Sequence, residues 1–254
     1  MSSHFDPSVL KRPRWIAAIV VASMVAALFV VLGMWQLDRH EERQASNSLI
    51  ELRSQQAPRP LAELQIEFGN DPDDLAHRRT VVEGTYRSSD EFFSIGRAYG
   101  SLVGSLVLTP LDLDDGSTVI VVRGVVPADT PGPPAKGFEA PTSRVVLEGR
   151  LDDGENPQRI GEPEPPTGHL ESLSRVDLGF IDTWIDGDVL QFSILLDEQL
   201  PTQESAPVPV PDDELSEGSH LGYAFQWFSF AVIAIVGLVA LLYRAGRVDL
   251  ISEA

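Results

Sequence analysis

The chain has 254 residues, with 19 basic side chains against 38 acidic ones and no cysteine. Without cysteine, disulfides, thiolate metal sites and iron–sulfur clusters are excluded. The formal net charge of −19 argues against nucleic acid as a partner, because phosphate backbones repel an acidic surface.

The first element is an uncharged apolar stretch from Trp15 to Trp35. Twenty residues at a rise of 1.5 Å make a helix roughly 30 Å long, which is enough to cross the bilayer core. The stretch is too long for the apolar region of a signal peptide, and no small-residue cleavage site follows it. We therefore predict a tail at 1–14 and a retained transmembrane helix at 15–35.

A second uncharged stretch lies near the other end, from Ala224 to Tyr243. It predicts a transmembrane helix at 223–243 and a second tail at 244–254. Basic residues flank the outer ends of both helices: Lys11, Arg12, Arg14, Arg244 and Arg247. The positive-inside rule then predicts a multi-pass protein of the plasma membrane, with both termini in the cytoplasm and the intervening chain outside.

Between the helices the chain reads as a stalk followed by one β-rich domain. Residues 36–60 favour a helix that continues the first span and ends near the prolines after Ala57. The region 61–198 alternates apolar and polar residues in short runs, which is typical of strands. We expect strands at 79–86, 91–95, 103–111, 118–126, 144–151 and 189–196, a hairpin turn at 114–116 and a short helix at 175–186.

The predicted fold class is therefore a membrane protein in which two transmembrane α-helices flank a β-rich α+β extracytoplasmic domain, either a barrel or a sandwich. The chain between the two spans carries 14 basic and 35 acidic residues. Its net charge of about −21 favours solubility. Two segments rich in proline and acidic residues, 152–168 and 198–219, predict mobile chain. The second predicts an extended tether at 199–222 that returns to the membrane.

Four motifs occur in a fixed order along the chain. Leu32-Gly-Met-Trp-Gln-Leu-Asp-Arg39 leaves the first span, and Arg79, Val81, Gly84 and Tyr86 mark a strand. Val122-Arg-Gly124 with Pro127 ends another strand, and His220-Leu-Gly-Tyr-Ala-Phe-Gln-Trp-Phe-Ser-Phe-Ala231 begins the second span. Together they resemble the Surfeit locus protein 1 family over nearly the whole chain. The third motif departs from the family pattern, because Val122 and Val125 replace an asparagine and a tryptophan.

Members of that family are assembly factors for haem-copper cytochrome oxidases, and some bacterial members are thought to deliver haem a to the large oxidase subunit. The resemblance thus implies an assembly factor that is not an enzyme and binds haem a transiently. Its implied partners are the large oxidase subunit, the haem a synthesis machinery and the lipid bilayer. The main alternative is a haem-free scaffold that stabilises an assembly intermediate. A third possibility is a tethered receptor domain for another ligand.

Candidate cofactor-binding residues cluster where the second span begins. His220, as neutral imidazole, is the candidate metal ligand to haem iron. Tyr223 and Trp227 fall at i+3 and i+7 on the same helical face, and Gln226 lies close to it. If the spans pack antiparallel, Arg39 emerges at the same surface and a guanidinium there suits a haem propionate.

The middle motif adds Arg123 as a further candidate. Each candidate also has a purely structural interpretation. Tyr223 and Trp227 fit an aromatic belt, Arg39 fits lipid headgroups, and His220 fits an ordinary helix start. Arg123 fits a salt bridge at the edge of the core.

His40 is not part of the family motif, and we expect it to be solvated. Small residues recur along each span, at Ala18, Ala22 and Ala26 and at Ala234, Gly237 and Ala240. They predict close helix contact in lipid, either between the two spans or with a partner subunit. Sequence motifs of phosphate-binding loops, serine hydrolases and zinc peptidases are absent, so we do not expect catalysis.

Overall fold

The structure, a computed structural model, describes residues 7–99, 102–154, 170–212 and 215–246. Most of the segment predicted to be mobile at 152–168 therefore lies outside the described residues, as do both chain ends. The chain forms two compact units. The helical unit comprises the chain up to Leu49 and from Leu215 onward, and the barrel unit comprises Ile50–Glu214.

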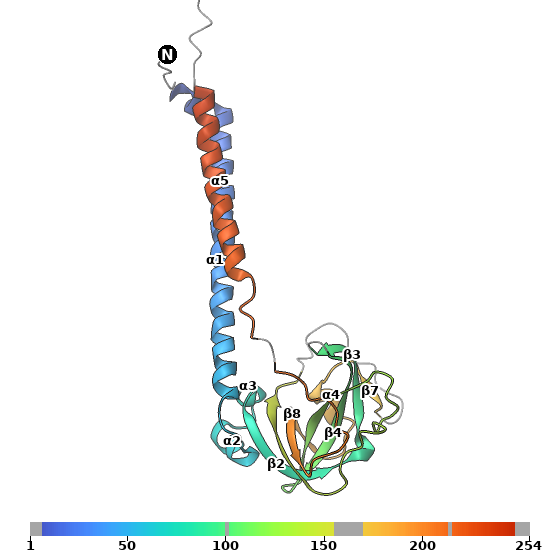
Figure 1. Ribbon diagram of the computed structural model, residues 1–254. Coiled ribbons are helices and arrows are strands. Elements are labelled where there is room, and N and C mark those ends of the chain that lie inside the picture. Colours follow the sequence, from blue (N-terminus) through green and yellow to red (C-terminus); the bar gives the residue numbers. More distant parts are fainter. Residues whose placement is uncertain (1–6, 100–101, 155–169, 213–214, 247–254) are drawn as a thin grey trace, which may run out of the picture. The chain divides into compact units, whose positions relative to one another are not determined.

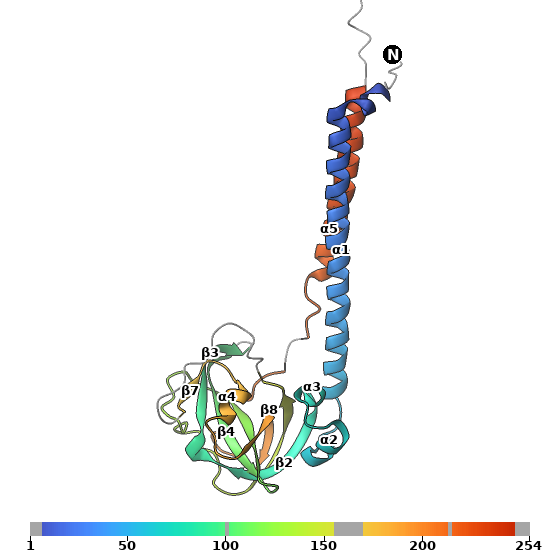
Figure 2. The same cartoon turned by 180° about the vertical axis from the view of Figure 1, so that it is seen from behind.

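The helical unit contains a short 3₁₀ helix, η1 (Pro7–Lys11), and two long helices, α1 (Pro13–Ser54) and α5 (His220–Gly246). Both long helices are apolar and long enough to cross a membrane. They run antiparallel, side by side, as Figures 1 and 2 both show. Few side chains of their apolar stretches are buried within the protein, an exposure that lipid accommodates and water does not. The prediction of two membrane helices flanking a β-rich domain is confirmed.

A heptad pattern explains how α1 and α5 pack. On α1 the shielded positions alternate in steps of four and three residues: 15, 19, 22, 26, 29, 33, 36 and 40. On α5 they follow the same rhythm, at 220, 224, 227, 231, 234 and 238. Such spacing keeps one seam of each helix against the other. A side chain at Gly33 would lie only 2.6 Å from the ring of Phe228, so this glycine allows the close approach.

The predicted row of small residues on the first span faces this seam, since Ala26 is buried and Ala18 and Ala22 are half-buried. Of the row on the second span, only Ala234 faces this seam. Gly237 and Ala240 are exposed, and the seam instead continues from Ala234 to Leu238. A three-residue repeat drifts around a helix of 3.6 residues per turn, whereas alternating steps of three and four stay on one face.

The barrel unit contains most of the secondary structure. Its elements are β1 (Arg59–Pro60), α2 (Leu61–Phe68), α3 (Pro72–Leu75), β2 (Arg79–Tyr86), η2 (Ser88–Asp90), β3 (Phe92–Tyr99), β4 (Leu102–Leu113), β5 (Ser117–Val126), β6 (Val145–Asp152), β7 (Ser172–Leu173), α4 (Leu178–Asp182) and β8 (Asp188–Leu200). Every predicted strand is present, with ends shifted by up to four residues. The helix predicted at 175–186 is only five residues long, and α2 and α3 were not predicted.

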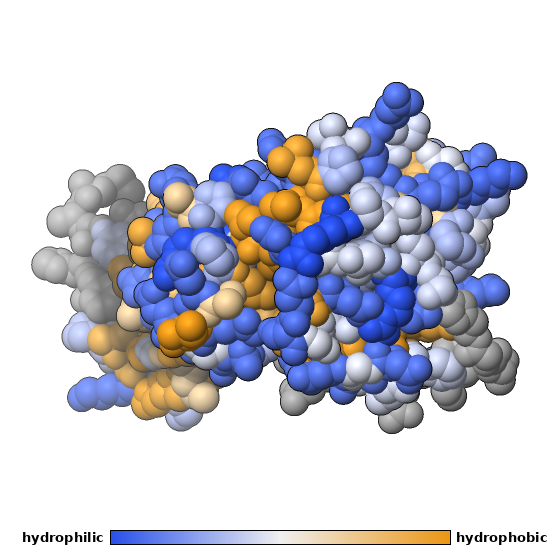
Figure 3. Space-filling model, turned by 90° about the horizontal axis from the view of Figure 1, so that it is seen from below, coloured by the Kyte–Doolittle hydropathy of each residue, from blue (hydrophilic) through white to orange (hydrophobic). Residues whose placement is uncertain are grey.

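Five strands close into a barrel in the order β2-β6-β8-β5-β4 and back to β2. All neighbours are antiparallel except β5 and β8, which are parallel. This is the Greek-key arrangement of the OB fold. The strand β3 pairs with the outer part of β4 and carries the short β7 at its far edge. Figure 3 views this unit from below and shows a mainly hydrophilic surface interrupted by apolar residues.

Gly84 explains how β2 closes the barrel. Residues 79–84 pair with β6, and residues 84–86 pair with β4, so the strand changes partner at this glycine. A Cβ at Gly84 would lie 2.5 Å from the carbonyl oxygen of Asp112 and 2.8 Å from Cγ of Leu111. The glycine of the second sequence motif is therefore required by the close crossing of two strands.

The central strand β5 is buried along its whole length because both of its faces are covered. Val119 and Val121 point into the barrel core with residues of α2 and β6, whereas Ile120 and Val122 pack outside it with residues of β3 and α4. A strand covered on two sides reads as a continuous apolar run, as this one does.

The chain after β8 does not leave the barrel at once. Val208 donates to the carbonyl of Val125 at 2.9 Å and accepts from its amide at 2.7 Å. Arg150 also holds this segment, through the carbonyl oxygen of Val210 at 2.9 Å and the carboxylate of Asp212 at 2.6 Å. Part of the segment predicted as an extended tether is thus bound to the barrel. We call residues 202–212 the proline strap.

Candidate functional site

The site begins with a hydrogen bond between the two long helices. His220, the first residue of α5, places Nδ1 2.8 Å from the amide oxygen Oε1 of Gln36 on α1. An amide oxygen can only accept, so Nδ1 donates this hydrogen bond, and in the neutral imidazole Nε2 would then carry the lone pair. Orientation of an imidazole through its second nitrogen is the usual way in which a protein prepares a metal-binding histidine.

A second set of polar groups lies one and two turns further along α1. His40 Nε2 lies 3.9 Å from the carboxylate of Glu217, and Gln44 donates to the same carboxylate at 3.3 Å. The expectation that His40 is solvated was wrong, because its residue surface is only 8% exposed. Its position in the heptad seam, four residues after Gln36, would have predicted this burial.

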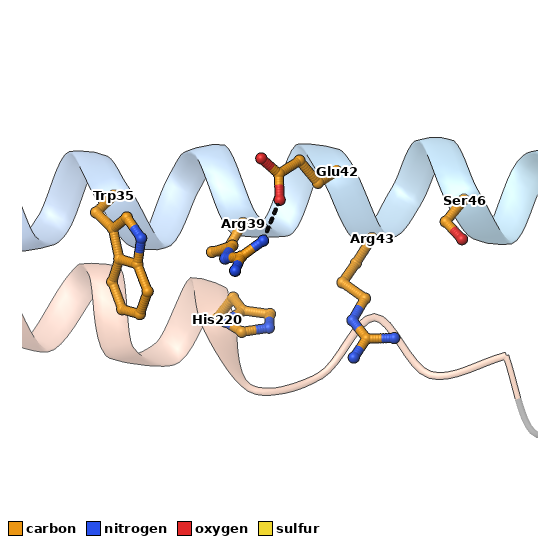
Figure 4. A pocket seen from close by; sticks show the side chains of 6 residues that line it. All are labelled: Trp35, Arg39, Glu42, Arg43, Ser46 and His220. Atoms are coloured by element: carbon orange, nitrogen blue, oxygen red, sulfur yellow. Dashed lines mark hydrogen bonds and ion pairs between the residues drawn. The ribbon is translucent and has the colours of Figure 1, made fainter. Parts of the chain in front are cut away.

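A cavity of about 470 Å³ lies beside His220 within the helical unit. Its lining residues are Trp35, Arg39, Glu42, Arg43, Ser46 and His220. Figure 4 shows the side chains of both arginines and His220 directed toward the same side of α1. Trp35, Arg39, Glu42 and Ser46 lie at i, i+4, i+7 and i+11, so a single helix face supplies most of the wall. Trp35, Glu42 and Ser46 were not predicted as site residues from the sequence, although this spacing would have identified them.

The two arginines of the cavity differ in their partners. Arg39 forms an ion pair with Glu42 at 2.5 Å, and both side chains are more than half exposed. Within the described part of the chain, Arg43 has no ion-pair partner. Arg43 is therefore the guanidinium that is free to bind an added carboxylate, whereas Arg39 would have to leave Glu42 first.

The aromatic and amide candidates of α5 lie elsewhere. Trp227 stacks on Phe29 with a centroid distance of 5.6 Å and meets Phe230 edge-on at 5.9 Å, so it belongs to the packing between the helices. Tyr223 is 50% exposed, and Gln226 is also exposed. None of these three side chains lines the cavity. The structure therefore brings together His220 and Arg39 but not Tyr223, Gln226 and Trp227.

Arg123 belongs to the barrel unit, where it occupies a β-bulge of β5 opposite β4. Its guanidinium pairs with Glu91 at 3.1 Å, and both side chains are completely buried. It also donates to the carbonyl oxygen of Phe138 at 2.8 Å and to the side chain of Gln203 at 2.9 Å. These contacts match the interpretation of Arg123 as a core ion pair.

Chemically, the cavity of the helical unit offers an imidazole lone pair, a free guanidinium, a second guanidinium in an exchangeable ion pair, and an indole. It lies where the apolar stretch of α1 ends and the charged stretch begins. Such a set suits a ligand with a metal centre, an apolar body and carboxylate groups. The Trp35 side chain, half exposed, could contact the apolar body.

Comparison with known proteins gives a consistent result. The model of the SURF1 family matches residues 23–232. Uncharacterised SURF1-like proteins of Mycobacterium bovis and of Mycobacterium tuberculosis strain H37Rv are each 28% identical over 243 residues, which cover 94% of this chain and 87% of theirs. A SURF1-like protein of Monosiga brevicollis is 25% identical over 240 residues, covering 85% and 84% of the two chains.

Proposed function

The chain belongs to the SURF1 family, known as oxidase assembly factors, and from this premise we propose that it binds haem a transiently and delivers it to the large oxidase subunit. In this proposal the protein is a carrier and does not catalyse a reaction. The site is the cavity between α1 and α5, and the metal ligand is His220.

The observation that carries the proposal is the hydrogen bond from His220 Nδ1 to Gln36. It supports the tautomer in which Nε2 can bind iron, and it fixes the ring before any ligand arrives. His220 would hold haem through this nitrogen, and haem when bound would supply the iron that the nitrogen ligates. Gln36 is a positioning residue, because it acts only through His220.

The charges of the cavity support the same ligand. Haem carries two propionates, and a guanidinium binds a carboxylate through two parallel hydrogen bonds. Arg43 is free to form such a pair, and Arg39 can form one in exchange for Glu42. A site with one free and one exchangeable cation favours moderate affinity, which a carrier needs in order to release its cargo.

We further propose that α1 and α5 span the plasma membrane with both termini in the cytoplasm, as the flanking basic residues predict. In that orientation the barrel unit and the cavity face the extracytoplasmic side. Haem could then be received from the synthesis machinery and passed on without leaving the membrane boundary. Cysteine labelling of single-cysteine variants tests the orientation directly, because the chain has no native cysteine.

The test of haem binding is an absorption spectrum of the full-length protein, purified in detergent from a host that makes haem a. We expect a Soret band in the wild type, its loss in His220→Ala and a weaker band in Gln36→Ala. The matched control is Gln226→Ala, which changes an exposed amide of α5 outside the cavity and should keep the full band.

Three results would contradict the proposal. No Soret band in the wild type, together with co-purification of the large oxidase subunit, would favour the haem-free scaffold. An equal band in wild type and His220→Ala would move the ligand to another residue. Normal oxidase assembly in a strain that lacks the protein would favour a receptor for a different ligand.

A further inference from the structure

A groove opens in the barrel unit where the parallel strands β5 and β8 separate. Their pairing ends at Val122 and Leu195, although both strands continue for several residues. Beyond this point β8 keeps its pairing with β6 on one side. Among the described residues, no backbone hydrogen bond joins the other edge of residues 196–200 to any segment.

The proline strap runs back beside this edge without pairing with it. Val208 directs both its amide and its carbonyl toward Val125 of β5. Because backbone groups alternate in direction along an extended chain, residues 207 and 209 present their groups to the opposite side. Both are prolines and have no N–H to donate. The strap therefore cannot form a strand ladder with β8, and the edge of β8 stays open.

The space between them is a cavity of about 430 Å³ lined by residues 196–200 of β8, by the strap and by Arg123. Its lining is partly apolar, since Leu200 is 64% exposed. Two of its lining residues keep a buried N–H without a partner among the described residues, at Arg123 Nε and Gln199 Nε2. Buried donors without partners are costly, so this part of the barrel carries unmet hydrogen-bonding capacity beside the cavity.

We propose that this groove binds an extended peptide segment of a partner protein, which adds as a strand to the free edge of β8. In strand addition the main-chain hydrogen bonds supply affinity and side-chain pockets supply selectivity. Five residues of edge correspond to a segment of about 16 Å at a rise of about 3.3 Å per residue.

Charge indicates what the segment carries. Glu198 lines the groove, and within the described part of the chain it has no ion-pair partner. The partner segment is therefore basic, with lysine or arginine beside apolar residues. It lacks proline at the positions that donate to β8. This inference concerns the barrel unit alone, so it does not depend on haem binding in the helical unit.

The test uses the full-length protein in detergent and a phage-displayed library of random heptapeptides as the probe. Enriched peptides are synthesised, and their binding is measured by fluorescence anisotropy. We expect proline-poor basic peptides whose affinity falls at least tenfold when alternate amides on one edge are N-methylated, since this removes strand-pairing donors. Hydrogen exchange of the amides of residues 196–200 should slow when such a peptide is bound.

Two variants and one control make the test specific. Pro207→Val combined with Pro209→Val restores donors to the strap, which should pair with β8 and lower peptide affinity at least tenfold. Leu200→Lys should lower it by repelling basic peptides. Ile66→Lys changes an exposed apolar residue of α2 and should leave it unchanged. The proposal is overturned if no peptide is enriched or if N-methylation has no effect. It is also overturned if peptides bind the double proline variant and Leu200→Lys as tightly as the wild type.

Discussion

The buried ion pair between Glu91 and Arg123 offers a quantitative test of the barrel core. Glu91 accepts three hydrogen bonds, from Arg123 at 3.1 Å, from Thr109 at 2.7 Å and from the amide of Ala135 at 2.7 Å. Both charged side chains are completely buried. Removal of one partner from such a pair costs about 3–5 kcal/mol, because it leaves an uncompensated charge. A typical domain has a free energy of unfolding of only about 5–15 kcal/mol.

We therefore expect Glu91→Leu and Arg123→Met each to lower the free energy of unfolding by about 3–5 kcal/mol. The double variant should be more stable than either single variant, since it removes both charges together. Urea unfolding of the full-length protein in detergent measures these values. Trp184 reports on the barrel unit, because the other three tryptophans, Trp15, Trp35 and Trp227, lie in α1 and α5.

Glu83→Gln provides a matched control, since its ion pair with Arg144 is exposed on both sides. Exposed ion pairs contribute little, so its unfolding midpoint should stay close to that of the wild type. The reasoning is refuted if the effects of the two core substitutions are additive in the double variant. It also fails if either single substitution leaves the unfolding curve where the wild type has it.

Three further results are expected. Glu42→Gln frees Arg39 and should strengthen haem retention in the purified protein, whereas Arg43→Ala should weaken it; equal spectra would refute the assignment of the free guanidinium. Gly124 has a φ of +129° and a Cβ there would collide with the carbonyl oxygen of Val208, so Gly124→Ala should cost about 1–3 kcal/mol and speed hydrogen exchange at the Val208 amide. Burial, aided by the neighbouring Asp153, raises the pKa of Asp152. The protonated carboxyl thus stabilises the fold at acidic pH, and this contribution is lost as the pH rises through the raised pKa. Asp152→Asn should therefore be more stable than the wild type at pH 7. The difference in the free energy of unfolding should shrink toward pH 4.

Strands and spans were predictable because their signals are local. Alternation of apolar and polar residues, together with turn residues, predicted every strand of the barrel. The length of the uncharged apolar stretches predicted both membrane helices. Closure of the barrel was not predictable, because it depends on which strands meet. Gly84 signals a close approach, but only the fold reveals that β2 changes partner there. The short helices α2 and α3 were missed because eight and four residues give too few periodic positions.

The candidate site was predicted in part. The motif identified His220 and the spacing placed Arg39 near it, and these two residues do line one cavity. Gln36 belongs to the first motif, but its bond to His220 depends on the register of two antiparallel helices, which the sequence does not show. Tyr223 and Gln226 share a motif with His220, yet a helix turns them away from α1. Motif membership alone therefore did not predict which side chains converge.

The parallel pairing of β5 with β8 has a consequence for synthesis. About 62 residues separate the end of β5 from the start of β8, and β8 is the strand that joins β5 to β6. At about 5–20 residues per second, the ribosome delivers that interval in roughly 3–12 s. Until β8 is made, the edges of β5 and β6 that pair with it stay exposed. A nascent copy is therefore most prone to aggregate just before its last strand is made.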